Sequence, residues 1–250
     1  MIYYGDHSIT IDGKNTWTDF HLAPKSRPEF APPKMKTKLV SVEGASSRLD
    51  LSTTLTGYPI FENSDGSWEF ICDPDYTNWA DIYMRVMSWV HGRTRKVILE
   101  DDPDYFRECL LTVNSHKSED HYTSFTISYS AKPYKREHQT IAQLYPEPFA
   151  GTVCEAANWK QVVPNIMSYF GEEPVTPILT ASANSEIYVR YYNKNLNQLV
   201  GFDTDNGIRV YAGTHEHPEI VFGNYGDDNE VIFQCKGVGT LWVDFRRGWL

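Results

Sequence analysis

The stretch YTSFTISYSA, residues 122–131, alternates apolar and hydroxyl-bearing side chains over most of its length. Phe125, Ile127, Tyr129 and Ala131 fall on one side of an extended chain, and the intervening Ser and Thr residues fall on the other. One buried face and one hydrated face are typical of strands in antiparallel sheets. The segment therefore predicts a β-strand with one face in a core.

The same period of two recurs along the chain and predicts a mostly β fold. Turn signals between the strands come from Asp12-Gly13, Asp65-Gly66 and Asn206-Gly207. In the first half the alternating segments are SITI at 8–11, LVSV at 39–42 and SWEFIC at 67–72. In the second half they are SEIYVRYYN at 185–193, NGIRVYAG at 206–213, EVIFQCKG at 230–237 and TLWVDFRRG at 240–248.

One segment, TNWADIYMRVMSWVHGR at 77–93, has helical periodicity instead. Thr77 is placed to cap the start of this helix and Gly92 to end it. An amphipathic helix packed on a sheet is expected, with one apolar stripe in the core. The stripe consists of Trp79, Ile82, Tyr83, Val86 and Val90.

The residue composition changes near 132–148, where three prolines and a cluster of charged residues predict a linker. We therefore expect two domains, residues 1–135 and residues 136–250. The second is predicted to be a compact β-sandwich without a helix. Its last strand, near 240–250, is expected to pack back on the first domain.

The composition limits the classes of function. With 33 acidic against 23 basic residues and a net charge of −10, the chain is a poor candidate for gripping DNA, although an acidic surface would let DNA slide past. Cys72, Cys109, Cys154 and Cys235 are widely spaced and are expected to be reduced packing residues. The start of the chain lacks a signal peptide and no apolar run approaches a membrane span, which predicts synthesis in a cytoplasm without membrane insertion.

Candidate chemical motifs are few. His215 and His217 in THEHP would share one face of a strand, but no third ligand is near in sequence, and we interpret the segment as a polar turn ended by Pro218. The acidic LEDDPDY at 99–105 is interpreted as a solvated turn. DTDNG at 203–207 lacks the downstream Glu of a calcium loop, and KGVGTLW lacks a full dinucleotide motif. We predict no enzyme activity, no metal and no cofactor.

The order of elements over residues 16–70 resembles the distal tail protein (Dit) family of long-tailed, siphovirus-type phages and prophages. A Trp-x-Asp-Phe start leads through a Pro-rich crossing to a strand ending at Gly44, then to LDLS, LTG and a hairpin into WEF. The resemblance continues through HGRTRKVILEDDPDYF at 91–106 and PYK at 133–135, and FRRGWL at 245–250 is similar to the family's ending.

The resemblance implies a fold and a structural role. The first domain would be a ring-forming β-sandwich with one α-helix, and the second a galectin-like or carbohydrate-binding-module-like β-sandwich. The chain would form a homohexameric ring, single or stacked, at the distal end of the tail in the virion. That hub joins the tail tube protein to the tail-tip hub protein or baseplate, carries receptor-binding proteins, and leaves a channel through which phage DNA passes without specific binding.

A ring subunit needs two different complementary surfaces for its neighbours. The segment GASSRLDLSTTLTG at 44–57 contains no nucleophile–base pair, no metal-ligand spacing and no phosphate-binding loop. We therefore predict that it supplies part of this interface. The alternative is an ordinary surface connection inside the sandwich. The interface residues expected are Leu49, Asp50, Leu51, Leu55 and Tyr58.

A carbohydrate-binding module that attaches the tail tip to the host surface is the alternative function. Aromatic faces stack on sugars, and they also fill protein interfaces. Tyr188, Tyr192 and Trp242 are the candidate contacts with a sugar or a partner. A wall-degrading hydrolase is a third possibility, without a catalytic constellation to support it.

Overall fold

The structure is a computed structural model, and it confirms the prediction of a mostly β protein. It describes residues 7–44, 46–54, 58–73, 78–118, 123–163, 171–193, 198–199, 207–218, 220–221 and 231–250. The chain divides into two compact units, which are described separately. The first unit comprises residues 1–37, 60–136 and Leu250, and the second comprises residues 38–59 and 137–249.

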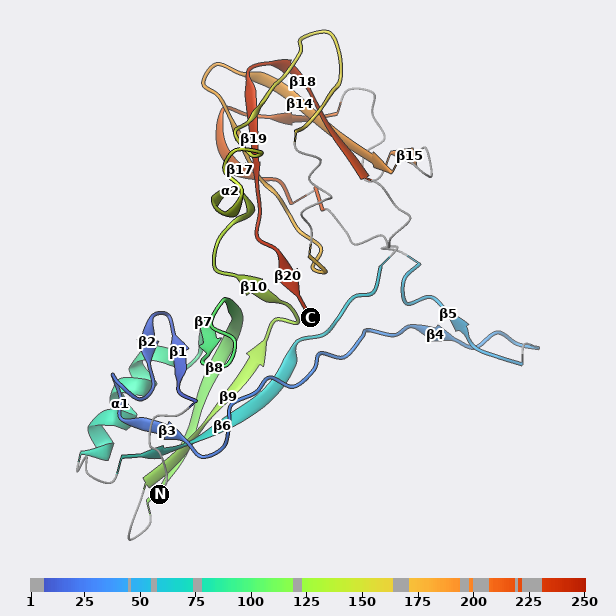
Figure 1. Cartoon of the computed structure of the whole chain (residues 1–250). Helices are drawn as coiled ribbons and strands as arrows, with labels where there is room; N and C mark the ends of the chain where they lie inside the picture. Colours follow the sequence, from blue (N-terminus) through green and yellow to red (C-terminus); the bar gives the residue numbers. More distant parts are fainter. Residues whose placement is uncertain are drawn as a thin grey trace. The chain divides into compact units, whose positions relative to one another are not determined.

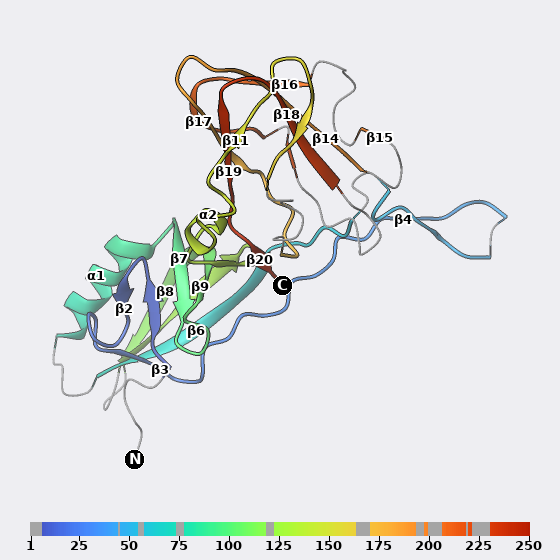
Figure 2. The same cartoon turned by 45° about the horizontal axis from the view of Figure 1, so that its top comes forward.

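The first unit is built on one sheet with the strand order β2-β1-β7-β8-β9-β6-β3, in which neighbouring strands run antiparallel and β10 pairs with β8 (Figure 1). Its strands are β1 (Ile9–Ile11), β2 (Lys14–Asn15), β3 (Leu22–Pro24), β6 (Ser64–Cys72), β7 (Arg93–Leu99), β8 (Tyr105–Ser118), β9 (Thr123–Ala131) and β10 (Lys135–Glu137). The helix α1 (Trp79–Val90) covers one face of this sheet (Figure 2).

The core of the first unit lies between this sheet and α1. The stretch that predicts a strand forms β9, where Phe125 and Ile127 are almost completely buried. Helix α1 buries Ile82, Val86 and Val90 in the same cluster, as its periodicity predicts. The helix begins after Asn78, whose side-chain oxygen accepts from the Asp81 amide at 3.4 Å, while Thr77 lies outside the described residues. Gly92 follows the helix with φ 67°.

The turn predicted at Asp65-Gly66 is wrong, because both residues lie inside β6. Gly66 pairs with Tyr129 of β9, and a Cβ at position 66 would collide with the Tyr129 hydroxyl. That hydroxyl donates to the Glu29 carbonyl at 3.2 Å and accepts from the Ala31 amide at 3.1 Å. Glycine at this position therefore makes room for a ring rather than a turn. The Asp12-Gly13 turn is present, joining β1 to β2.

In the second unit, the described part of residues 137–249 forms two sheets that enclose a separate core, as the alternation predicts for a β-sandwich. One sheet has the order β11-β19-β13-β17, and the other has the order β12-β18-β14-β15 with β16 paired to β14. The strands of the first sheet are β11 (Thr152–Val153), β13 (Ile178–Ala181), β17 (Gly213–Glu216) and β19 (Thr240–Asp244). The strands of the second sheet are β12 (Lys160–Gln161), β14 (Glu186–Asn193), β15 (Gln198–Leu199), β16 (Ile208–Val210) and β18 (Val231–Val238). The last strand of the described chain, β20 (Gly248–Trp249), belongs to neither of these two sheets. Residues 38–59 of the second unit contain a further, two-stranded sheet.

Two local predictions in this half are corrected. The segment 132–148 is not a plain linker, because it contains β10 and the short helix α2 (Ile141–Leu144), whose Ile141 is 1% exposed in the core. The segment around His215 is strand β17 rather than a turn, since it pairs along β13 from Gly213 to Glu216. In both places contacts with the sheets override the local polar composition.

The four cysteines are buried and none is in a disulfide. Burial raises the pKa of the Cys72 thiol to about 11 and that of the Cys109 thiol to about 12. Among the described residues, no helix is long and apolar enough to cross a membrane.

Candidate functional site

The segment 38–52, which we call the arm hairpin, differs from the other strand pairs. Among the described residues, its two short strands, β4 (Leu39–Val40) and β5 (Leu49–Asp50), pair antiparallel only with each other. The Leu51 amide donates to the Lys38 carbonyl at 2.9 Å, and the Lys38 amide donates to the Ser52 hydroxyl at 2.8 Å. The hairpin is thus a small, hydrogen-bonded ribbon with a defined register.

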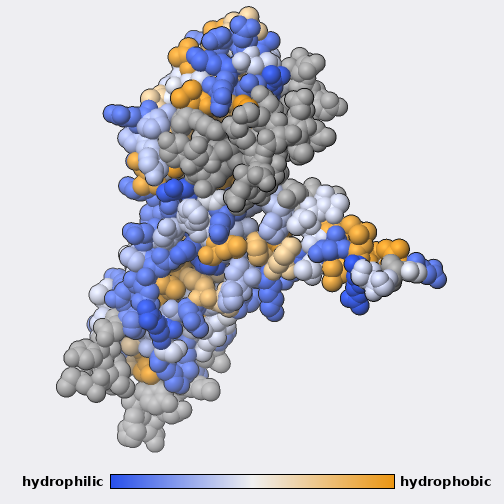
Figure 3. All heavy atoms as spheres, turned by 45° about the vertical axis from the view of Figure 1, so that its right-hand side comes forward, coloured by the Kyte–Doolittle hydropathy of each residue, from blue (hydrophilic) through white to orange (hydrophobic). Residues whose placement is uncertain are grey.

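Apolar side chains of the arm hairpin are exposed on both of its faces. Figure 3 shows hydrophobic surface on the side of the hairpin that is turned toward the viewer. Leu39 is 50% exposed and shares one face with its cross-strand partner Asp50, whereas Val40 and Leu49, at 37% and 52%, share the other. LVSV at 39–42 was expected to have one buried face, and that prediction is wrong because residues 39–42 are all exposed. Contiguous exposed apolar residues on a soluble protein mark surfaces that bind another molecule.

The predicted interface residues fall partly on this hairpin. Leu49 and Asp50 form β5, and Leu51, which follows them, is half-buried. Tyr58 is half-buried in the second unit, and burial raises the pKa of its phenol. Leu55 lies outside the described residues. The side chain of Asp50 accepts from the Ser52 amide at 2.9 Å and from its hydroxyl, and these bonds hold the pKa of the carboxyl below its usual range.

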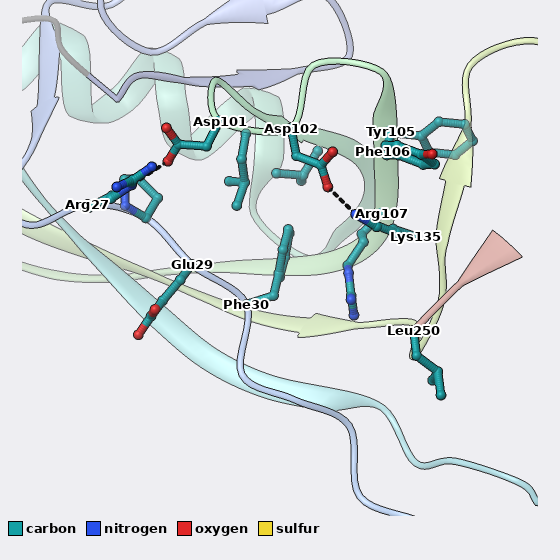
Figure 4. Close-up of a pocket in the computed structure, with 13 residues that line it drawn as sticks. Arg27, Glu29, Phe30, Asp101, Asp102, Tyr105, Phe106, Arg107, Lys135 and Leu250 are labelled. Carbon is teal, nitrogen blue, oxygen red and sulfur yellow. Dashed lines mark hydrogen bonds and ion pairs between the residues drawn. The ribbon is translucent and has the colours of Figure 1, made fainter. Parts of the chain in front are cut away.

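A pocket of about 420 Å³ lies in the first unit, and we call it the Arg107 pocket (Figure 4). Its charged groups are largely paired with one another. Arg27 donates to Asp101 at 2.7 Å, which lowers the pKa of that carboxyl, and Lys135 contacts Asp102 at 2.6 Å. The apolar lining consists of Pro28, Phe30, Val97, Leu99, Phe106 and Leu250.

Arg107 itself is only 8% exposed. Its Nη1 donates to the Pro133 carbonyl at 2.9 Å and more weakly to that of Lys132 at 3.5 Å, and its guanidinium lies 5.1 Å from the centre of the Phe30 ring. Over the described part of the chain, no carboxylate comes within ion-pair distance of this guanidinium. Burial lowers the pKa of Arg107, although an arginine keeps its charge in a protein. The pocket therefore holds a buried positive charge whose protein partners are backbone carbonyls.

Two of the residues predicted to contact a sugar or a partner, Tyr188 and Trp242, lie in different sheets of the second unit. Tyr188 is half-buried on β14, in the five-stranded sheet. Trp242 lies on β19, in the four-stranded sheet, and its ring nitrogen donates to the Ala150 carbonyl at 2.7 Å. Tyr192 is in β14, but its side chain is outside the described part of the structure.

The motifs weighed for metal binding serve other contacts. A ring nitrogen of His215 lies 3.1 Å from the Ala212 carbonyl. The acidic turn between β7 and β8 supplies Asp101 and Asp102 to the ion pairs of the Arg107 pocket. Within the described ranges, no group of three His, Cys, Asp or Glu side chains is arranged to hold a metal ion.

Arg107 is not among the site residues predicted from the sequence, although the sequence contains a signal for it. In β8, Cys109, Leu111 and Val113 alternate as the buried face, and Arg107 occupies the preceding position of the same face. A charged residue in register with a buried apolar stripe is unusual and marks a specific contact. The pocket walls, by contrast, come from distant segments that no local pattern connects.

No family model and no curated protein matches the chain by sequence. Among solved structures, the chain is similar to the crystal structure of the SPP1 Dit protein (gp 19.1), described as a paradigm of the hub adsorption apparatus in phages that infect Gram-positive bacteria. The two share 12% sequence identity, a TM-score of 0.54, and coverage of 98% of this chain and 99% of the other. The chain therefore has, along its whole length, the fold of a phage distal tail protein.

Proposed function

We propose that this protein is a structural component of the distal end of a phage tail, where copies of the chain assemble into a ring. The full-length fold similarity to a tail hub protein supports the class of function. The observation on this chain that supports assembly is the set of exposed apolar residues on the arm hairpin. An isolated subunit would leave these side chains in water, whereas a neighbouring copy would cover them.

In this proposal the ring is a hexamer, single or stacked, that joins the tail tube to the tail tip and carries receptor-binding proteins. Residues 1–135 would build the ring, and the galectin-like sandwich of residues 136–250 would carry partners. DNA would pass through the central channel without specific binding, in keeping with the net charge of −10. The protein would act as a scaffold rather than as an enzyme.

The solution mass of the purified chain tests the proposal, measured by light scattering over a wide range of concentrations. We expect a species of six times the chain mass of 28.8 kDa, or twice that for stacked rings, which increases with concentration. Replacing Val40 and Leu49 together by Ser should shift the protein toward the monomer, whereas Leu110→Ser, at an exposed apolar position of β8 outside the hairpin, should not.

A chain that remains monomeric at every concentration, and that also fails to associate with purified tail tubes, would contradict the ring. If such a monomer bound cell-wall polysaccharide, the carbohydrate-binding function would replace the proposed one. Binding to tail tubes in the absence of self-association would retain the tail role and reject the autonomous ring.

A further inference from the structure

The arm hairpin and the Arg107 pocket have complementary properties. The pocket offers a buried guanidinium without a carboxylate partner, surrounded by apolar side chains. The hairpin offers an exposed carboxylate beside an exposed leucine, because Asp50 and Leu39 are cross-strand partners on one face. The chain thus carries both halves of a charged and apolar contact.

Resting on the proposed assembly of copies, we propose that the Leu39–Asp50 face of the arm hairpin inserts into the Arg107 pocket of a second copy of this chain. Asp50 would pair with the Arg107 guanidinium, and Leu39 would pack among the apolar side chains of the pocket.

The electrostatics favour this occupant over a purely apolar one. A buried charge without a counter-charge is costly, and the cost is relieved when a carboxylate reaches it with good geometry. The other two cations of the pocket already have partners in Asp101 and Asp102, so Arg107 is the group left to bind an incoming anion. Figure 4 shows Glu29, the remaining acidic residue of the lining, pointing away from Arg107.

The hairpin is prepared for such a contact. Asp50 is ionised and oriented by its bonds to Ser52, which use one of its two oxygens and leave Oδ2 for a guanidinium. We infer that the Asp50 carboxylate comes from a second copy of the chain. The arm hairpin and the Arg107 pocket are two different surfaces, so every copy can offer its hairpin to one neighbour and its pocket to another. Contacts between two different surfaces are heterologous, and they close into a ring when the rotation between copies allows it.

A double-mutant cycle on self-association tests the pairing. Asp50→Asn and Arg107→Gln should each weaken association by about tenfold or more, and the double variant should lose little beyond the larger single loss. Glu43→Gln, at another exposed acid of the same hairpin, and Lys25→Gln, at a cation of the first unit that is paired with Glu69 and does not line the pocket, are the matched controls and should have small effects. Arg107→Lys covers the case in which Arg107→Gln fails to fold, and it should retain part of the affinity.

Disulfide trapping tests whether the arm hairpin reaches the Arg107 pocket, and whether the hairpin and the pocket belong to different copies of the chain. A Leu39→Cys chain and a Tyr105→Cys chain should form a covalent heterodimer when they are mixed with oxidised glutathione, since residue 105 lines the pocket. The native thiols are buried and should not compete. Leu39→Cys mixed with Leu110→Cys, an exposed position of the same strand β8, should remain uncrosslinked.

The outcomes separate the two proposals. Association that is insensitive to Asp50→Asn and Arg107→Gln, without trapping, would overturn the pairing and leave the ring intact. A disulfide that forms only within a chain carrying both cysteines would also overturn it, by placing the contact inside one copy. A chain that neither associates nor crosslinks at any concentration, and that also fails to bind purified tail tubes, would overturn both proposals.

Discussion

Strand β9 and the arm hairpin share an alternating sequence pattern, but the apolar side chains of β9 are buried and those of the arm hairpin are exposed. In β9, Phe125 and Ile127 are at most 2% exposed, because β8 and β6 flank the strand and α1 covers its apolar face. In the arm hairpin, Leu39 and Leu49 are half-exposed, because within the described structure each short strand pairs only with the other. An alternating pattern therefore specifies an extended conformation, and the neighbours decide whether its apolar face is covered within the same chain.

The contrast suggests two roles for apolar residues in this protein. Those of β9 stabilise the folded subunit, whereas those of the arm hairpin contribute little to it and are available to a partner.

Thiol reactivity should show the largest difference. A Leu49→Cys thiol should react with Ellman's reagent at the rate of an unstructured peptide. Burial raises the pKa of Cys109 to about 12, so its thiolate fraction at neutral pH is lower by about three orders of magnitude and its reaction slower by at least that factor. The measurement follows each rate in a background in which the other native cysteines are replaced by Ala or Ser. Similar rates at the two sites would refute the difference in burial.

Truncation of the core should cost more than truncation of the arm. Phe125→Ala should lower the unfolding free energy of the first unit by about 3–5 kcal/mol, because it leaves a cavity between the sheet and α1. Leu49→Ala should change the stability of the isolated chain by less than about 0.5 kcal/mol. Native-state hydrogen exchange of the β8 and β9 amides measures both, and comparable losses would contradict the assignment of the arm to partner binding.

Gly66 of β6 probes how closely the β9 side of the sheet is packed. Gly66→Ala should destabilise the first unit by about 1–3 kcal/mol, because the new methyl group meets the Tyr129 ring. Ser67→Ala, at the exposed neighbouring position, serves as the control. Removing the hydroxyl with Tyr129→Phe should recover part of the loss in the Gly66→Ala background, and an additive result would place the cause elsewhere.

The arm should show the smallest effect, in its response to pH. The pKa of Asp50 is lowered in the folded hairpin, so its bonds to Ser52 are fully present above the unfolded pKa and are lost as the pH falls through the folded value. Carboxyl carbon shifts of Asp50 and exchange of the Ser52 amide should report one transition, below the usual range for aspartate. In Ser52→Ala the pKa should return toward that range, and an unchanged pKa would show that these bonds are not its cause.

Much of the fold could be predicted from local patterns. The strand at 122–131 and the helix at 77–93 have unambiguous periods, and the structure contains both as β9 and α1. The prediction failed at Asp65-Gly66, where a turn dipeptide is used for a cross-strand contact with Tyr129. A local signal cannot distinguish those two uses of glycine, because the ring that needs the space comes from a distant strand.

Local sequence patterns were sufficient to predict the extended strands and the amphipathic helix, because these patterns depend on residues a few positions apart. Only the tertiary structure decided that LVSV at 39–42 has no buried face and that Arg107 shares a pocket with Phe30 and Asp102. Those facts depend on which segments meet in space, and side-chain burial and charge pairing are set by such long-range contacts rather than by local periodicity.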